Sequence, residues 1–232
     1  FPTAELADIA HTVLRDDGTR ILQYGLTAGE RDLRRHIVAT TPAATTIDGV
    51  VVTTGSQQGL ELLAAVLIDP GDAVVVADPE YLGATQAFRR AGAELVAVPS
   101  DADGLDIDGL DAALADGLRP KFVYLVPHFH NPSGATLADD RRLRLLSLAE
   151  RFGFLVVFDD PYRELFLDDD APIDPGAHPM AVHLRSASKV LAPGLRVGWL
   201  IAPEWLAAAV ERAKQSADLH TSTVSQAIVF GA

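Results

Sequence analysis

The sequence has 232 residues, of which 48% are hydrophobic and 22% charged, as expected of a folded protein rather than a disordered one. Acidic residues outnumber basic ones by 32 to 19, and the net charge of −13 disfavours binding of nucleic acid through this segment. Cysteine, a secretory signal and an apolar run of membrane-spanning length are all absent, which excludes disulfides and thiolate chemistry and leads us to expect a cytoplasmic protein without membrane contact.

The first 45 residues are expected to form a helical segment without a strand of its own. Apolar residues recur at helical spacing over about Ala4–Leu14 and again over Glu30–Thr40, and these stretches flank Gln23-Tyr24-Gly25. We expect this segment to pack on the outside of a larger domain formed by residues 46–232. The last residues, 221–232, are typical of a helix that is still running, so we interpret the chain as a piece of a longer protein.

Seven β-rich runs predict the strands of the larger domain, and most of them are continuously apolar. Such runs are typical of strands buried on both faces, as in a parallel sheet covered by helices. Helical patterns at Gln57–Leu67, Leu82–Ala91, Leu137–Arg151 and Glu204–Gln215 accompany them, so the alternation predicts an α/β layered domain. An acidic, proline-rich stretch at Asp168–Pro179 predicts a surface loop. The predicted strands are Val50–Thr54, Ala73–Ala77, Glu94–Val98, Lys121–Val126, Phe154–Phe158, Ala181–Arg185 and Arg196–Ala202.

Polar residues follow at least five of these runs, at the point where each strand would end. In open α/β sheets the ligand binds at the carboxyl ends of the strands, so these residues are candidates for a binding site. A domain with a purely structural role does not need polar residues gathered at the same ends of five strands. The segments are Gly55-Ser56-Gln57-Gln58, Asp78-Pro79-Glu80-Tyr81, His128–Gly134, Asp159-Asp160-Pro161-Tyr162, and Ser186-Ala187-Ser188-Lys189 with Arg196 shortly after.

Lys189 is the candidate reactive amine. It follows a serine-rich turn in which Ser186 and Ser188, together with Arg196, are able to converge on one phosphate group. Beside a bound phosphate, a lysine is suited either to clamp the phosphate or to form a Schiff base with an aldehyde, whereas most lysines are only solvated surface charges. At the level of these residues, all three interpretations stay open.

Two further segments have both a functional and a structural interpretation. Gly55-Ser56-Gln57 opens a helix after a strand, where free N–H groups and the helix dipole bind anions, although a simple N-cap at Ser56 also explains it. Asp159 ends an apolar strand, where a carboxylate is costly without a cationic partner. Asp159 is either a structural residue, in a turn or at an N-cap, or the partner of a protonated heterocycle. Its neighbour Asp160 is expected to cap the following turn.

The order of these segments resembles the class I and II aminotransferases, which are pyridoxal-phosphate enzymes of fold type I. The resemblance runs over nearly the whole chain, from Tyr24-Gly25 to Trp199. It implies a three-layer αβα domain with a mostly parallel seven-stranded sheet, pyridoxal 5′-phosphate as cofactor, and transfer of an amino group between an amino acid and a 2-oxo acid. The motifs that carry it are Gly-Ser-Gln-Gln, Pro-x-Tyr, Asn-Pro-x-Gly, Asp-x-x-Tyr, Ser-x-Ser-Lys and Gly-x-Arg-x-Gly.

The resemblance also implies a role for each site residue. Lys189 would hold the cofactor aldehyde as a Schiff base and move a proton during turnover, and Asp159 would keep the pyridine nitrogen protonated. Tyr162, the third catalytic residue, and Asn131 would hydrogen-bond the phenolic oxygen of the ring, and Tyr81 would stack on the ring face. The phosphate would be bound by Gly55, Ser56, Gln57, Ser186, Ser188 and Arg196.

Tyr24 matches a family position that reaches the phosphate of the neighbouring subunit, so the resemblance implies a homodimer with a shared active site. The alternative is a tyrosine buried in the core of its own subunit. His128 and His130 depart from the family pattern, which often has Asn-Phe-Gln-Asn here. They either satisfy loop hydrogen bonds or provide a substrate contact or an acid–base group near the ring. Tyr124, inside a strand, is expected to be a core residue.

The family is usually much longer than this chain. The small C-terminal domain, with the arginine that clamps the substrate carboxylate, is therefore expected to lie outside it. Decarboxylation, racemisation, elimination, and cyclase or oxidase reactions use the same cofactor site and stay open, as does the effector-binding domain of an aminotransferase-like transcription regulator. A domain without cofactor is the remaining alternative, and the sequence does not name the amino acid.

Overall fold

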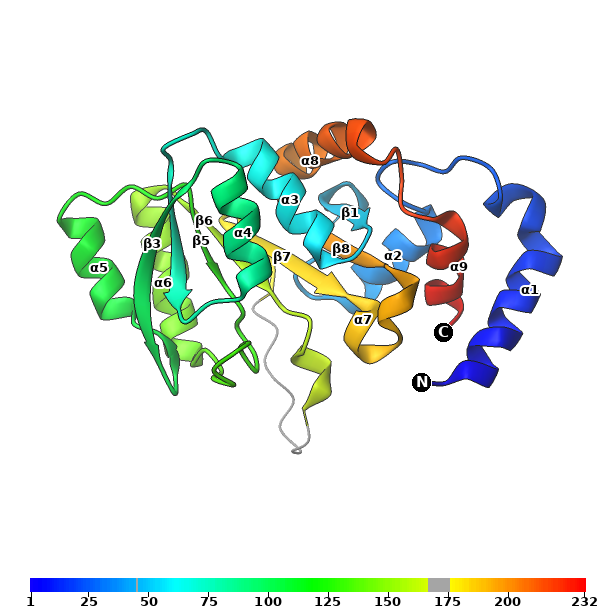
Figure 1. The fold of residues 1–232 in the computed structure, drawn as a ribbon, viewed down its shortest axis with the longest axis horizontal. Coiled ribbons are helices and arrows are strands. Elements are labelled where there is room, and N and C mark those ends of the chain that lie inside the picture. The colour runs from blue at the N-terminus through cyan, green and yellow to red at the C-terminus, as the bar shows by residue number, and fades with distance from the viewer. Residues whose placement is uncertain (45, 167–175) are drawn as a thin grey trace.

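The computed structural model describes residues 1–44, 46–166 and 176–232 and shows a sheet with helices on both faces (Figure 1). Within these residues the sheet has eight strands: β1 (Val50–Thr53), β2 (Ala73–Asp78), β3 (Glu94–Asp101), β4 (Gly104–Leu105), β5 (Phe122–Leu125), β6 (Leu155–Asp159), β7 (Ala181–Ser186) and β8 (Gly198–Ile201). Their order across the sheet is β1-β8-β7-β6-β5-β2-β3-β4. Neighbouring strands from β7 to β3 are parallel, whereas β8 is antiparallel to β1 and β7, and β4 is antiparallel to β3.

The predicted α/β class and the mostly parallel sheet are confirmed, but the described residues form eight strands rather than the expected seven. The additional strand is β4, which turns back at Asp103 and pairs with the end of β3 through two residues. Sequence patterns reveal strands of roughly 4–8 residues, so a two-residue strand leaves no recognisable apolar run.

Most of the helices lie in two layers, one on each face of the sheet, and α1 and α9 lie at one side (Figure 1). The α-helices of the described residues are α1 (Thr3–Ile21), α2 (Arg31–Thr40), α3 (Ser56–Leu67), α4 (Leu82–Arg90), α5 (Ile107–Ala115), α6 (Asp139–Phe152), α7 (Ala187–Val190), α8 (Glu204–Ala217) and α9 (Thr223–Gly231), with short 3-10 helices at Ile47–Gly49, Arg163–Leu165 and Pro193–Leu195. Helices α3, α4 and α8 contribute to the hydrophobic core on one face, and α2, α5 and α6 contribute to the cores on the other. The arrangement is therefore the expected three-layer αβα fold.

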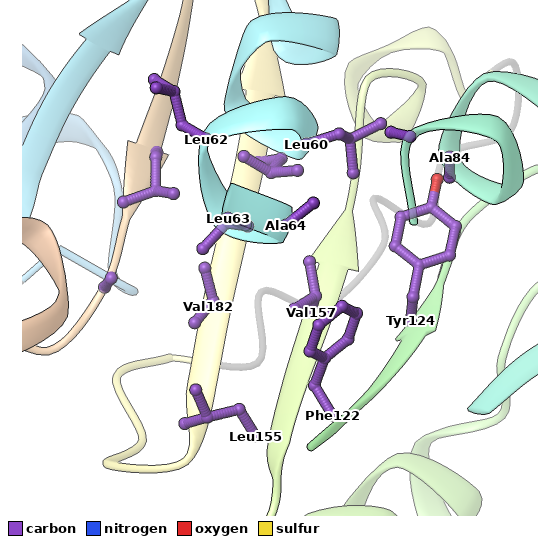
Figure 2. Close-up of a cluster of buried hydrophobic side chains, with 14 of the residues drawn as sticks. Leu60, Leu62, Leu63, Ala64, Ala84, Phe122, Tyr124, Leu155, Val157 and Val182 are labelled. Carbon is purple, nitrogen blue, oxygen red and sulfur yellow. The ribbon is translucent and has the colours of Figure 1, made fainter. Parts of the chain in front are cut away.

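The central strands are buried on both faces because their side chains alternate between two cores. In β5, Phe122 and Tyr124 belong to the core beneath α3 and α4, whereas Val123 and Leu125 belong to the core beneath α5 and α6. Figure 2 shows Leu63 of α3 directed toward the face of the sheet from which Phe122 and Tyr124 project. Burial on both faces explains why these strands are continuously apolar in the sequence.

Helices α1 and α5 differ from the prediction, and the serine-rich turn at Ser186 opens the short helix α7. Helix α1 ends at Ile21, whereas the predicted helix ended near Leu14. The prediction stopped early because the polar segment after Leu14 has no apolar repeat, although it is helical in the structure. Arg20 pairs with Asp17 at i,i+3 spacing in this segment, and Ile21 is buried. Helix α5 was not predicted, although Asp106 supplies its N-cap by accepting hydrogen bonds from two backbone N–H groups.

The two ends of the described chain pack together at one side of the molecule (Figure 1). Helix α1 lies against α9, and α2 lies against β1 and α9. Gln226 of α9 is fully buried and accepts a hydrogen bond from the backbone N–H of Glu30 at 2.8 Å. The N-terminal helices and the last helix therefore form one packed group beside the sheet.

Three expectations concern the limits of the domain. The division of the chain at residue 45 into a helical segment and a main domain stays a prediction. Most of the predicted surface loop Asp168–Pro179 lies outside the described residues, which resume at Gly176. Among the helices that the structure describes, none has both the length and the apolar character needed to cross a membrane.

At Gly198, the backbone of β8 lies directly against the turn between β1 and α3. A Cβ atom at this position would come within 2.8 Å of the Gly55 carbonyl carbon, the Ser56 nitrogen and the Arg185 carbonyl oxygen. All three are backbone atoms, so a side chain at this position would have to displace a strand or the turn. The close approach therefore holds the start of α3 against the sheet.

We expect Gly198→Ala to lower the free energy of unfolding by about 1–3 kcal/mol, because the added methyl group overpacks against backbone. Gly194→Ala is the matched control, since no atom lies within 4 Å of its Cβ position. Its stability should change by less than about 0.5 kcal/mol. Urea unfolding followed by circular dichroism measures both variants, and equal stability of the two would contradict the close approach.

Candidate active site

A cavity of about 250 Å³ opens at the carboxyl ends of the parallel strands, between the start of α3 and the loops that follow β2, β5, β6 and β7. Ten of the twelve residues predicted for the site line this cavity, and only Gly55 and Tyr24 do not. The fold thus brings together segments that are far apart in the sequence. The lining residues are Ser56, Gln57, Tyr81, Val126, Asn131, Asp159, Pro161, Tyr162, Ser186, Ser188, Lys189, Pro193 and Arg196.

The start of α3 is built to receive an anion. Gly55 is the N-cap of this helix and has a φ of +78°, a conformation that favours glycine. The first turn offers backbone N–H groups and the positive end of the helix dipole. A Cβ atom on Gly55 would lie 2.5 Å from Nη2 of Arg196, so the glycine leaves room for the guanidinium beside the turn.

The other donors at this end of the cavity are held in place by the backbone. Arg196 has a φ of +55°, and its guanidinium donates a hydrogen bond to the carbonyl oxygen of Thr54 at 3.3 Å. Ser186 is the N-cap of α7, and its Oγ accepts a hydrogen bond from the backbone N–H of Ser188 at 3.1 Å. Ser186 pairs with Gly198, which lies against the start of α3. A guanidinium, hydroxyls and backbone N–H groups together suit a phosphate group.

Asp159 lies at the end of β6 and is 3% exposed. Its Oδ2 accepts a hydrogen bond from the Tyr124 hydroxyl at 2.9 Å, while Oδ1 is buried with no hydrogen-bond partner among the described residues. Burial raises the pKa of Asp159 to about 7; the charges of Asp160 and Glu80 act in the same direction, and the hydrogen bond from Tyr124 opposes them. A cationic N–H group in the cavity would satisfy the remaining oxygen and favour the ionised carboxylate.

Tyr124 is a core residue, as predicted, but its contact with Asp159 was missed. The side chain is fully buried, and burial together with the charge of Asp159 raises the pKa of Tyr124 well above the usual tyrosine value. Tyr124 is opposite Val157 of β6, so it lies on the same face of the sheet as Asp159, two residues further along. No sequence signal marks this contact, because it depends on the register between two strands.

An amine and two aromatic rings border the cavity. Lys189 lies in the short helix α7, and its Nζ is 5.7 Å from the centre of the Tyr162 ring. The Tyr81 ring packs against Gly83, where an added Cβ atom would lie only 2.6 Å from it. The Tyr81 hydroxyl donates a hydrogen bond to Oε1 of Gln57 at 3.4 Å. Gln57 in turn donates to the carbonyl oxygen of Gly83 at 3.1 Å, which holds the tyrosine at the start of α3.

His128 and His130 satisfy hydrogen bonds between loops and do not line the cavity, which supports the structural interpretation of both. Nδ1 of His128 lies 2.9 Å from the carboxylate of Asp160, which therefore pairs with a histidine instead of capping the following turn. Nε2 of His130 lies 3.0 Å from Glu80, and its Nδ1 lies 2.9 Å from the Ser133 hydroxyl. These contacts tie the loop after β5 to the loops after β6 and β2, its neighbours in the sheet.

Tyr24 lies outside the cavity, on the surface of the molecule. It is 84% exposed, and its ring meets the edge of the His220 ring with 5.9 Å between the centroids. The alternative of a tyrosine buried in the core of its own subunit is therefore wrong.

Several known proteins with similar sequences are named as aminotransferases. The family model for aminotransferase class I and II matches residues 2–232. The chain is 40% identical over 240 residues to the 2-aminoadipate transaminase of Thermus thermophilus and 38% identical over 242 residues to aromatic-amino-acid aminotransferase 1 of Thermococcus litoralis. Both alignments cover 99% of this chain and 58% of the relative.

A solved structure has the same fold as this chain. It is the α-aminoadipate aminotransferase LysN from Thermus thermophilus, complexed with N-(5′-phosphopyridoxyl)-L-leucine. The TM-score is 0.93 at 38% identity, and the match covers 99% of this chain and 60% of that one. The chain therefore spans about three fifths of the length of the proteins it matches.

The raised pKa of Asp159 predicts that the stability of the protein without ligand depends on pH. In the unfolded chain the carboxyl titrates near its ordinary pKa of ~4. Since the folded pKa is about 7, the folded protein binds more protons than the unfolded chain between these values, and stability falls as the pH rises through this window. We expect Asp159→Asn to raise the free energy of unfolding at pH 8 by roughly 2–4 kcal/mol and to leave it nearly unchanged at pH 4.

Urea unfolding at the two pH values measures this effect. Asp8→Asn, on the exposed side of α1, is the control and should leave the stability unchanged at both. An Asp159→Asn variant less stable than the unmodified chain at pH 8 would contradict the unfavourable burial of the ionised carboxylate.

Proposed function

Because the chain belongs to the class I and II aminotransferases, we propose that it transfers an amino group between an amino acid and a 2-oxo acid, using pyridoxal 5′-phosphate bound in the cavity. The observation that carries this proposal is the buried Oδ1 of Asp159, which lacks a partner among the described residues and lies in the same cavity as Lys189. A carboxylate in this position needs a cation, and a protonated pyridine nitrogen meets that need.

The residues present fit the cofactor at both of its charged ends. Its phosphate would be held by the first turn of α3, by Ser186 and Ser188, and by the guanidinium of Arg196, where Gly55 leaves the space for them. When bound, pyridoxal phosphate supplies an electron sink for the carbanion that forms when a proton leaves the α-carbon of the substrate. Asp159 would maintain that sink by keeping the ring nitrogen protonated.

The remaining residues of the cavity would orient the cofactor and move the proton. Tyr81 would lie against the ring face, and Tyr162 and Asn131 would hydrogen-bond its phenolic oxygen. Lys189 would hold the aldehyde covalently between turnovers. Once the amino group of the substrate had displaced it, its free Nζ would accept the proton from the substrate α-carbon. Other reactions on this scaffold use the same residues and differ only in which bond of the substrate breaks, so a half-reaction distinguishes them.

In the full chain loaded with cofactor, an amino donor should change the cofactor absorbance, and pyruvate or 2-oxoglutarate should restore it. Lys189→Ala should retain the cofactor through the phosphate-binding residues but lose turnover by two or more orders of magnitude, about 3 kcal/mol. Borohydride should attach the cofactor to Lys189 in the unmodified chain. Lys121→Ala is the control, because Lys121 pairs with Asp72 at the start of β5, away from the cavity. Unchanged turnover of Lys189→Ala would refute its role.

We further propose that the protein is a cytoplasmic homodimer with a shared active site. Tyr24 supports this proposal because its side chain is exposed together with Leu22 and Leu26, which are 68% and 49% exposed. Exposed apolar side chains that lie close together are typical of contact surfaces between proteins. The Tyr24 phenol would reach the phosphate of the cofactor bound by the partner subunit.

Tyr24→Phe should raise the dissociation constant of the cofactor about tenfold or more, the loss expected for one hydrogen bond to a charged group. The melting temperature should stay unchanged, because the phenol is exposed and packs on no core of its own subunit. Dilution should weaken cofactor retention in the unmodified chain. A protein that is monomeric by sedimentation and turns over normally would contradict the shared site.

A further inference from the structure

Lys214 of α8 is a buried cation that does not line the cavity. Its side chain is 0% exposed, which is rare for a lysine, and burial lowers its pKa. Taking an ammonium group out of water is costly, so it persists only with close partners. Nζ of Lys214 lies 2.8 Å from one oxygen of Asp218 and 2.8 Å from Oε1 of Gln58.

These three residues and Thr54 form one closed hydrogen-bonded group, which we name the Lys214 cluster. Gln58 donates through Nε2 to Asp218 at 2.6 Å. Thr54 donates twice, from its backbone N–H to Oε1 of Gln58 at 2.7 Å and from its hydroxyl to Asp218 at 2.9 Å. Lys214 therefore neutralises Asp218 and donates to the oxygen of the Gln58 amide, while Asp218 accepts from the nitrogen of that amide.

The Lys214 cluster lies directly behind the anion-binding end of the cavity. Thr54 immediately precedes Gly55, and its carbonyl oxygen accepts the hydrogen bond from the guanidinium of Arg196. Gln58 is in the first turn of α3, two residues after Ser56. The cluster thus contacts both parts of this end of the cavity, the turn that Arg196 binds and the helix start that offers N–H groups.

We propose that Lys214 is a positioning residue for phosphate recognition, acting through Gln58 and Thr54 to hold the turn at Gly55 and, with it, Arg196. The inference rests on the proposed function, since it assumes that the anion bound here is the phosphate of the cofactor. Lys214 does not line the cavity, so it does not contact the cofactor itself. It acts instead through the turn at Gly55 and the start of α3, which would hold the phosphate.

A purely structural role makes a different prediction. Buried ion pairs are often replaced by apolar residues with little loss of stability, so the pair is not explained by stability alone. If Lys214 served only the packing of α8 against α3, its loss would affect binding of a phosphorylated and an unphosphorylated ligand equally. The ratio of the two affinities therefore separates positioning from packing.

The experiment compares the dissociation constants of pyridoxal 5′-phosphate and pyridoxal for the full chain, measured by absorbance titration. Lys214→Met should weaken binding of pyridoxal phosphate about tenfold or more, and that of pyridoxal less than about twofold. Lys121→Met is the control, because it removes another paired lysine, which lies directly before β5 at the amino ends of the parallel strands, and it should leave both constants unchanged. A folded Lys214→Met variant with an unchanged ratio would overturn the inference.

Thr54→Val decides the question if Lys214→Met does not fold. It keeps the shape of the side chain and the backbone N–H contact, and removes the hydroxyl that bonds Asp218 and also lies 3.2 Å from the Thr221 hydroxyl. We expect a loss of about threefold for pyridoxal phosphate and none for pyridoxal, and an unchanged ratio would again overturn the inference. If the unmodified chain itself shows no preference for pyridoxal phosphate over pyridoxal, the proposed function fails. This outcome is distinguishable from failure of the inference, which would appear only as an unchanged affinity ratio in the variants.

Discussion

A carboxylate oxygen that is buried at the end of β6, with no hydrogen-bond partner among the described residues, is the constraint on which the candidate site depends. Asp159 completes a strand that is buried throughout, and the hydrogen bond from the Tyr124 hydroxyl partly offsets its lost hydration. Such a group raises the energy of the ligand-free protein, and the protein relieves this cost either by taking up a proton or by binding a cation. The cavity beside Asp159 provides the place for that cation, with the amine of Lys189 and the anion-binding start of α3 around it.

The loops that border the cavity are held from behind by buried polar pairs. Because loops lack the regular hydrogen bonds of helices and strands, side chains on them keep one position only where other contacts fix them. The two histidine pairs join the loop after β5 to the loops after β6 and β2. Lys214 and Asp218, at the end of α8, bind Gln58 and Thr54 at the start of α3, so these parts of the cavity wall support one another. The pairs are His128 with Asp160, His130 with Glu80, and Lys214 with Asp218.

Sequence reasoning located the cavity residues because each follows a predicted strand, and parallel strands end at the same edge of a sheet. The same reasoning missed the contact between Tyr124 and Asp159 and assigned Asp160 to a turn. Both involve residues on adjacent strands or loops whose relative position depends on register. Lys214 was not singled out at all, since a lysine on an amphipathic helix is ordinarily exposed, and only its place above the start of α3 buries it.

By itself, the sequence determined the class of the fold, the approximate strands and the set of residues gathered at their ends. These properties are local, because burial on both faces produces continuous apolar runs and each motif lies next to the strand that carries it. Only the tertiary structure decided that a two-residue strand β4 joins the sheet, that Tyr24 projects into solvent, and that one oxygen of Asp159 has no partner among the described residues. Those outcomes depend on contacts between residues far apart in the chain, and such contacts follow from packing and register rather than from any local pattern.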